Sequence, residues 1–156
     1  MKKIHWCLKI KKGLEITEPN INLSKAYLKK AEDSLEVLSE IKDESWKISV
    51  GYYVMYFSLY SILMKIGVKS ENHSCTIEFM KKLLSEYFSE KEADFLDSSK
   101  NTRIDAQYHT KKIPVKQYKE ITKRAPGFFI KCKETLNRLT EEEIKKIRKN
   151  LKQQNI

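Results

Sequence analysis

Residues 46–66, WKISVGYYVMYFSLYSILMKI, decide the fold, because this segment is apolar on nearly every side when it is drawn as a helix. A helix without a polar face must be covered by other elements, so the remaining helices should pack around it. Gly67 follows directly and is a typical helix stop. The apolar run at 50–64 also contains several hydroxyl groups, whereas a membrane span needs roughly 18 to 20 apolar residues. The segment therefore predicts a buried central helix and no membrane association.

Helical patterns flank this segment on both sides. Apolar residues recur at spacings of three and four between residues 23 and 41, which predicts an amphipathic helix. Further helices are predicted at about 74–88, from about 91 to the stretch HTKKIPV at 109–115, and at about 118–136. The APG sequence at 125–127 should kink or interrupt the last of these.

The two ends of the chain have different patterns. Residues 1–19 alternate like a strand, but the KIKKG sequence within them also resembles the last turn of a helix with its glycine cap, and we favour a short helix. Thr140 and Glu143 have the spacing of a capping box. Residues 140–153 are therefore predicted to form a solvated terminal helix, with Glu142 and Lys146 paired along it.

The composition favours one all-α domain. The chain has 156 residues and is 40% hydrophobic, enough for a single core, and it has only 4 glycines and 3 prolines. Turn-rich sandwiches, barrels and glycine-dependent nucleotide folds need more of both. We expect an up-and-down bundle of five to six helices over residues 1–156, with its core at about 22–138, an N-terminal extension at 1–19 and the solvated helix at the C-terminus.

The charge favours a polyanionic partner. Lys and Arg total 31 against 21 Asp and Glu, which leaves a net charge of +10. Such a field attracts polyanions, and RNA or another nucleic acid is the natural candidate. The acidic residues are interspersed along the chain, so no single basic arm is predicted.

The cysteines favour reduced thiols. Cys7, Cys75 and Cys132 are odd in number and far apart, and the N-terminus is a poor signal peptide, so a cytoplasmic protein is expected. The sequences HWC at 5–7 and HSC at 73–75 could supply zinc ligands. Their one-residue gap is tighter than the usual two to four, so small core cysteines are favoured and neither a metal nor a cofactor is expected.

The stretch NTRIDAQYHT at 101–110 combines the residues best suited to chemistry. Arg103 supplies a planar cation for phosphate, and His109 can exchange a proton near neutral pH. Together they could cleave RNA without a metal, and both are expected on a polar helix face. Six helical positions separate them by about 120° around the helix and roughly 9 Å along it. They can converge only if the chain bends before His109, or if two copies of the motif face each other across a twofold axis.

The chain resembles the HEPN domain superfamily, in particular its small stand-alone prokaryotic and archaeal members. The resemblance covers about residues 22–138, through the aromatic segment YYVMYFSLYSILMKIGVKSENHSCTIEF, then RIDAQY, then RAPGFF. It implies a helical bundle that forms homodimers, is often encoded beside a minimal nucleotidyltransferase as toxin and antitoxin, and in active members cuts RNA without metal.

The resemblance also assigns residues. Arg103 and His109 would be catalytic, and Asp105 and Tyr108 would contact substrate. In some such systems the antitoxin transfers AMP to a tyrosine near the motif, which makes Tyr108 notable. His73 has two interpretations: a packing or capping residue at a helix start, which we favour, or a residue of the same cleft as Arg103.

Two functional hypotheses follow. The first is a HEPN-like protein that binds RNA or a nucleotide and is a candidate metal-independent endoribonuclease. The second is a non-enzymatic helical module that binds a protein partner and keeps a degenerate nuclease motif. The first needs Arg103 and His109 in one accessible cleft, whereas the second needs only an exposed apolar surface.

Overall fold

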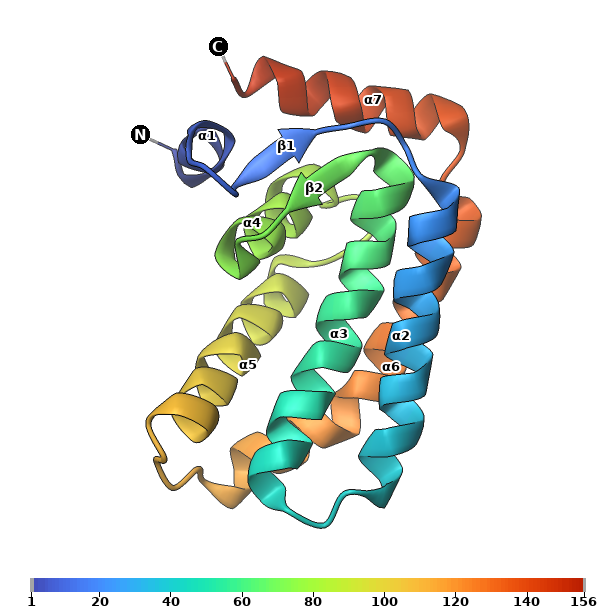
Figure 1. Cartoon of the computed structure of the whole chain (residues 1–156). Helices are drawn as coiled ribbons and strands as arrows, with labels where there is room; N and C mark the ends of the chain where they lie inside the picture. Colours follow the sequence, from blue (N-terminus) through green and yellow to red (C-terminus); the bar gives the residue numbers. More distant parts are fainter. Residues whose placement is uncertain (1, 156) are drawn as a thin grey trace.

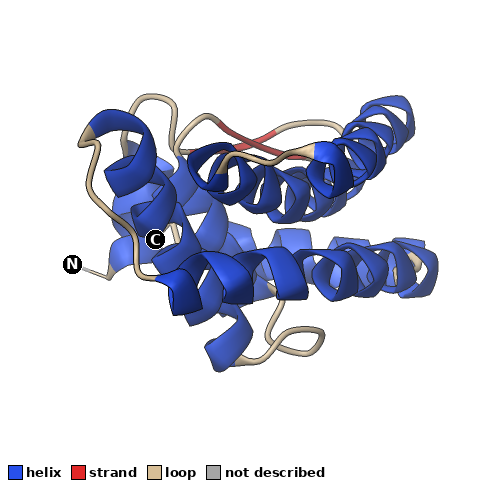
Figure 2. Ribbon diagram, turned by 90° about the horizontal axis from the view of Figure 1, so that it is seen from below, coloured by secondary structure: helices blue, strands red, loops and turns tan. Residues whose placement is uncertain are grey.

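The protein is described here by a computed structural model that covers residues 2–155. Helix makes up 76% of it, so the prediction of a mainly helical chain is confirmed (Figures 1 and 2). The described residues form seven helices and two short strands: α1 (Lys3–Lys9), β1 (Leu14–Ile16), α2 (Ile21–Glu40), α3 (Glu44–Ile66), β2 (Val68–Ser70), α4 (His73–Leu83), α5 (Glu90–Tyr108), α6 (Val115–Arg138) and α7 (Glu141–Gln153). None of these helices is long and apolar enough to cross a membrane.

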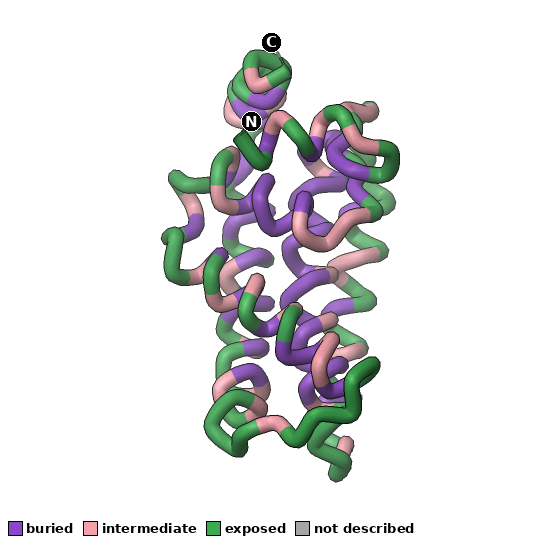
Figure 3. The backbone as a smooth tube through the Cα atoms, turned by 90° about the vertical axis from the view of Figure 1, so that its left-hand side faces the viewer, coloured by how far each residue is buried: buried purple, intermediate pink, exposed green. Residues whose placement is uncertain are grey.

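Helix α3 is the buried centre of the molecule, as its sequence predicts. Asp43 caps its first turn, and α2, α5 and α6 pack along it, so that buried residues line the inner faces of the helices (Figure 3). Tyr52, Met55 and Leu59 of α3 are fully buried. The helix ends at Gly67, whose φ of 87° is left-handed. A side chain there would also collide with the chain at Thr17 and Pro19, so both the backbone angle and the space require glycine.

The N-terminal segment contains both a helix and a strand. The predicted short helix is present as α1, but Leu14–Ile16 form β1, which pairs antiparallel with β2. Leu14 lies opposite Ser70, and Ile16 lies opposite Val68. Strand β1 was not predicted because its hydrogen-bonding partner, β2, comes only after α2 and α3 in the sequence.

A disulfide joins Cys7 of α1 to Cys75 of α4, so the expectation of three reduced thiols is wrong. The two cysteines are fully buried where α1 packs on α4, and their separation of 68 residues hid the pairing from sequence patterns. Cys132 is free and buried in α6 as a small core residue, and burial raises the pKa of its thiol.

Helix α6 differs from its expected form. It continues through Pro126, so the predicted interruption does not occur. Ala125 and Phe129, on either side of the proline, are both buried on the face that packs on the core. This burial offsets the hydrogen bond that proline cannot make, because packing of an apolar face outweighs local propensity.

Two other helices also depart from expectation. α7 has the predicted capping box, but Ile144, Ile147 and Leu151 are buried, so one face of it is packed and not solvated. Lys146 pairs with Glu86 at 2.9 Å and not with Glu142. Helix α4 is shorter than predicted, because the chain turns after Leu83 toward the cap of α5.

The disulfide should contribute strongly to stability. Closing a loop between positions 68 residues apart lowers the entropy of the unfolded chain, and the chain-entropy relation gives about 4 kcal/mol for a loop of this size. Urea unfolding with and without a reductant should therefore show a large loss of unfolding free energy on reduction. Cys75→Ala should match the reduced protein and should no longer respond to reductant. Equal stability of the native chain in both conditions would contradict the bond.

Candidate functional site

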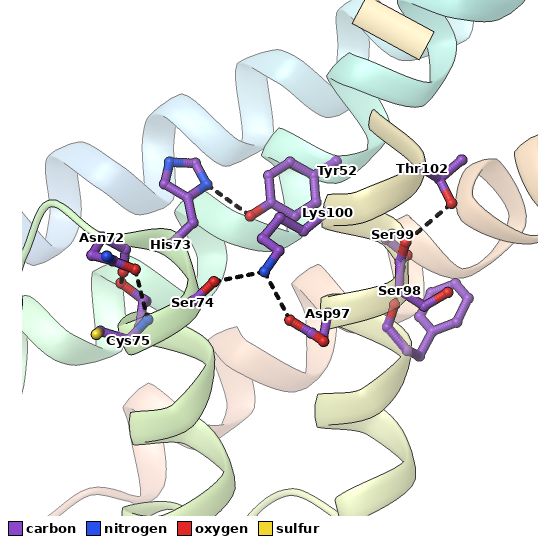
Figure 4. Close-up of polar contacts among 12 residues, drawn as sticks. Tyr52, Asn72, His73, Ser74, Cys75, Asp97, Ser98, Ser99, Lys100 and Thr102 are labelled. Atoms are coloured by element: carbon purple, nitrogen blue, oxygen red, sulfur yellow. Dashed lines mark hydrogen bonds and ion pairs between the residues drawn. The ribbon is translucent and has the colours of Figure 1, made fainter. Parts of the chain in front are cut away.

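Polar side chains from three helices meet on one side of α3. We call this group the Arg103 cluster and define it as Tyr52, Tyr53, Tyr56, His73 and Arg103. Helical spacing places the three tyrosines on neighbouring stripes of α3, His73 is the first residue of α4, and Arg103 lies within α5. Asn72 caps α4 by accepting a hydrogen bond from the Cys75 N–H at 3.1 Å, and this fixes where His73 lies (Figure 4).

Arg103 is the buried cation of this cluster. It is only 7% exposed, so its expected position on a polar helix face is wrong. Its Nη1 donates to the Tyr53 hydroxyl at 3.2 Å and to Gln107 Oε1 at 3.0 Å. The guanidinium carbon lies 5.1 Å and 5.3 Å from the ring centroids of Tyr52 and Tyr53, within the range of cation–π attraction. Nε is buried and has no hydrogen-bond partner within residues 2–155, so one donor of the guanidinium is unused.

His73 is held as a neutral imidazole. Its Nδ1 shares a hydrogen bond of 2.8 Å with the Tyr52 hydroxyl, and its ring stacks on Tyr56 with centroids 3.9 Å apart. Burial, followed by the charges of Arg103 and Lys100, lowers the pKa of His73 to about 4. Near neutral pH the ring is therefore uncharged and can accept a proton, although a pKa this low makes it a weak base.

Lys100 ties α5 to the start of α4. Its ammonium group donates to Ser74 Oγ at 2.7 Å and lies 3.0 Å from Asp97 Oδ1 (Figure 4). The side chain is 12% exposed, so this ion pair is partly sheltered from solvent. Asp97 balances the second cation of the site, whereas no carboxylate within residues 2–155 forms an ion pair with Arg103.

The other residues of the Arg103 motif point elsewhere. Helix α5 is regular as far as Tyr108, so the chain does not bend between Arg103 and His109. His109 is the exposed residue at the C-terminal cap, and Tyr108 is 66% exposed. Asp105 pairs with Lys111 at 3.4 Å. Within one chain, the structure thus brings His73 and not His109 to Arg103.

Sequence reasoning missed two partners of the cluster. Gln107 lies four residues after Arg103, a spacing that signals contact on a helix. Lys100 gave no such signal, because its partner Ser74 lies on another helix. Of the two interpretations of His73, the cluster position fits the contacts, since Asn72 does the capping and His73 bonds a tyrosine hydroxyl.

The paired His-x-Cys sequences do not form a metal site. Cys7 and Cys75 are joined to each other, and His5 Nδ1 is 2.8 Å from the carbonyl oxygen of Gln154. In the part of the chain that the structure describes, no group of three or more His, Cys, Asp or Glu side chains could hold a metal ion.

No protein-family model matches this chain, and no curated protein matches it either. Among the described residues, the Arg103 cluster is the strongest candidate for a functional site. It combines a buried cation, an unused donor and a neutral imidazole.

The low pKa of His73 should make stability depend on pH. The folded ring has a pKa of about 4, whereas an unfolded histidine has about 6.5. Between these values the unfolded chain binds the extra proton, so the free energy of unfolding should fall as the pH drops from 6.5 to 4. Urea unfolding across this range should show a smaller fall for His73→Gln. His109→Gln is the matched control, since His109 is exposed, and it should behave as the native chain. Equal pH dependence in all three proteins would contradict the burial of a neutral His73.

Proposed function

We propose that this chain is a HEPN-like protein that binds RNA as a homodimer and cleaves it without a metal ion, with Arg103 as the ligand of the reacting phosphate. The unused Nε donor of Arg103, held against two tyrosine rings, carries this proposal. A guanidinium presents a fork of donors that matches phosphate oxygens. The helices α2, α3, α5 and α6 run alternately down and up (Figure 1), which agrees with the bundle that the resemblance implies.

The chemistry needs only the RNA and side chains. A base takes the proton of the 2′-hydroxyl, the freed oxygen attacks the adjacent phosphorus, and the bond to the 5′-oxygen breaks. An acid protonates the departing 5′-oxygen, and a 2′,3′-cyclic phosphate remains. Arg103 stabilises the charge that builds on the phosphoryl oxygens. We assign the acceptance of the first proton to His73, because it is neutral and lies in the same cluster.

Dimerisation would bring His109 of one protomer to the Arg103 cluster of the other. A single chain leaves His109 exposed at the end of α5, away from the cluster. If α5 of each protomer lies near the twofold axis, His109 of the partner subunit faces the Arg103 cluster and can protonate the leaving oxygen. Val50, Tyr53 and Phe57 share one face of the otherwise buried α3 and are only partly covered, which supplies an apolar surface for such contact.

A second candidate function is a non-enzymatic partner module, with a minimal nucleotidyltransferase as the proposed partner. The low exposure of Arg103, 7%, favours it, because substrate would have to reach a covered side chain. Three large apolar residues are also exposed at the end of the bundle where α5 stops: Trp46, Tyr108 and Val115. Exposed apolar groups gathered in this way suit a protein partner.

Cleavage in the presence of EDTA should separate the two candidates. The native chain should cut single-stranded RNA into products with 2′,3′-cyclic phosphate ends. Arg103→Lys keeps the charge and most of the volume but loses the planar fork, and should slow cleavage by about 10² to 10³. His73→Gln and His109→Gln should each slow it by about 10² to 10⁴ if that ring transfers a proton. Circular dichroism and thermal unfolding must show that each variant is folded.

The pattern of losses decides the assignment. Loss in Arg103→Lys and His73→Gln alone identifies the intrachain cluster as the site, and loss in His109→Gln as well identifies a shared one. Absence of cleavage by the native chain under all conditions would reject the nuclease and leave the partner module.

Light scattering should report a mass twice that of the 18.5 kDa chain. Val50→Lys should shift the protein to monomer, because a charge would be placed on the proposed contact face of α3. Ile130→Lys is the control: Ile130 is 53% exposed on α6, and its substitution should leave the mass unchanged. A native chain that remains monomeric at all concentrations would reject the dimer.

A further inference from the structure

We propose that a pocket between the starts of α3 and α6 is a second phosphate-binding site, which takes the backbone of a single-stranded RNA at the end of the bundle where α5 stops. This inference rests on the proposed function, because both take RNA as the ligand. Both helix starts lie at the end of the bundle opposite α7 (Figure 1).

The pocket is strongly basic. Its volume is about 460 Å³, which suits one or two nucleotide units. Its lining has four lysines against one glutamate, together with two hydroxyl groups: Lys42, Glu44, Lys47, Tyr118, Lys119, Thr122 and Lys123. The Glu44 carboxylate accepts a hydrogen bond from the Tyr118 hydroxyl at 2.8 Å and so is already engaged.

The pocket lysines are not neutralised by carboxylates, unlike several lysines elsewhere in the described residues. Lys81, Lys131 and Lys146 lie within 3.1 Å of a carboxylate oxygen. The four pocket lysines form no ion pair within residues 2–155. Like charges gathered in one place repel each other, and an anion bound among them removes that cost.

Close helix packing keeps the pocket in shape. A side-chain carbon added to Gly51 of α3 would lie 3.0 Å from Ile121 Cγ2 of α6, so glycine permits a close approach of the two helices. Lys119 and Lys123 lie four residues apart and therefore share one face of α6. The approach at Gly51 also holds the start of α6 close to Lys47, one turn earlier on α3.

The start of α3 adjoins the Arg103 helix and carries an exposed aromatic ring. Ser45 Oγ lies 3.5 Å from the carbonyl oxygen of Ala106, so the start of α3 adjoins the end of α5. Trp46 follows directly and is 61% exposed, which is unusual for so large an apolar group. Every base has a face that can stack on an indole ring, so Trp46 suits a base of the strand whose phosphates lie among the lysines.

Salt dependence of RNA binding tests the lysines. The probe is a fluorescein-labelled oligouridylate titrated with native chain at several salt concentrations. Lys119→Gln/Lys123→Gln should reduce the slope of log K against log salt by about 0.7 for each lysine that contacts a phosphate. Lys145→Gln/Lys149→Gln is the matched control, with the same charge change and spacing on α7 at the other end of the molecule. It should leave the slope nearly unchanged.

Stacking should appear as a different signature. Trp46→Leu should weaken binding by roughly 5- to 150-fold, the equivalent of one stacked base, and should leave the salt slope unchanged. Trp6→Leu is its control, because Trp6 is 43% exposed on α1 at the opposite end. Trp6→Leu should bind as the native chain does.

The outcomes separate this inference from the proposed function. If the native chain binds the probe but the two lysine variants behave alike, the pocket is rejected while RNA binding stands. If Trp46→Leu and Trp6→Leu bind equally, the stacking position is rejected. If the native chain does not bind the probe even at low salt, both this site and the proposed function are overturned.

Discussion

The burial of nearly all of α3 is the constraint on which the rest of the structure depends. An apolar helix of this kind has no polar face that could be exposed to water. Helices α2, α5 and α6 therefore pack around it. The same requirement explains why α6 continues through Pro126: its buried face is needed on both sides of the proline. It also explains the close contact at Gly51, where a larger residue would push α6 away from the core.

This apolar helix carries hydrogen-bonding groups because a tyrosine ring can pack in the core while its hydroxyl forms a hydrogen bond. Burial raises the pKa of Tyr52 and of Tyr56, so both hydroxyls remain protonated and can form hydrogen bonds with uncharged partners. Tyr53 accepts from Arg103, and Tyr52 bonds His73. Aromatic rings thus stabilise a buried guanidinium that forms no ion pair with a carboxylate of residues 2–155.

Local signals were read well from the sequence, and contacts between distant segments were not. Helical spacing and capping patterns identified α2, α3 and the capping box at Thr140, since these depend on residues within one or two turns. The bond between Cys7 and Cys75 and the approach of His73 to Arg103 depend on how helices pack, which a single sequence does not encode in its spacing. Arg103 was expected on a polar face for the same reason, because the tyrosines that cover it come from another helix.

The position of the N-terminal segment has a consequence for the order of events during synthesis. α1 packs on α4, and β1 pairs with β2, so both of these early elements have partners that are made only after α3. Cys7 must stay unpaired until Cys75 has been added, and β1 has no edge to join until β2 exists. The segment of α1 and β1 therefore cannot find its place until α3, β2 and α4 have been made, and until then its apolar groups and one thiol are open to other molecules.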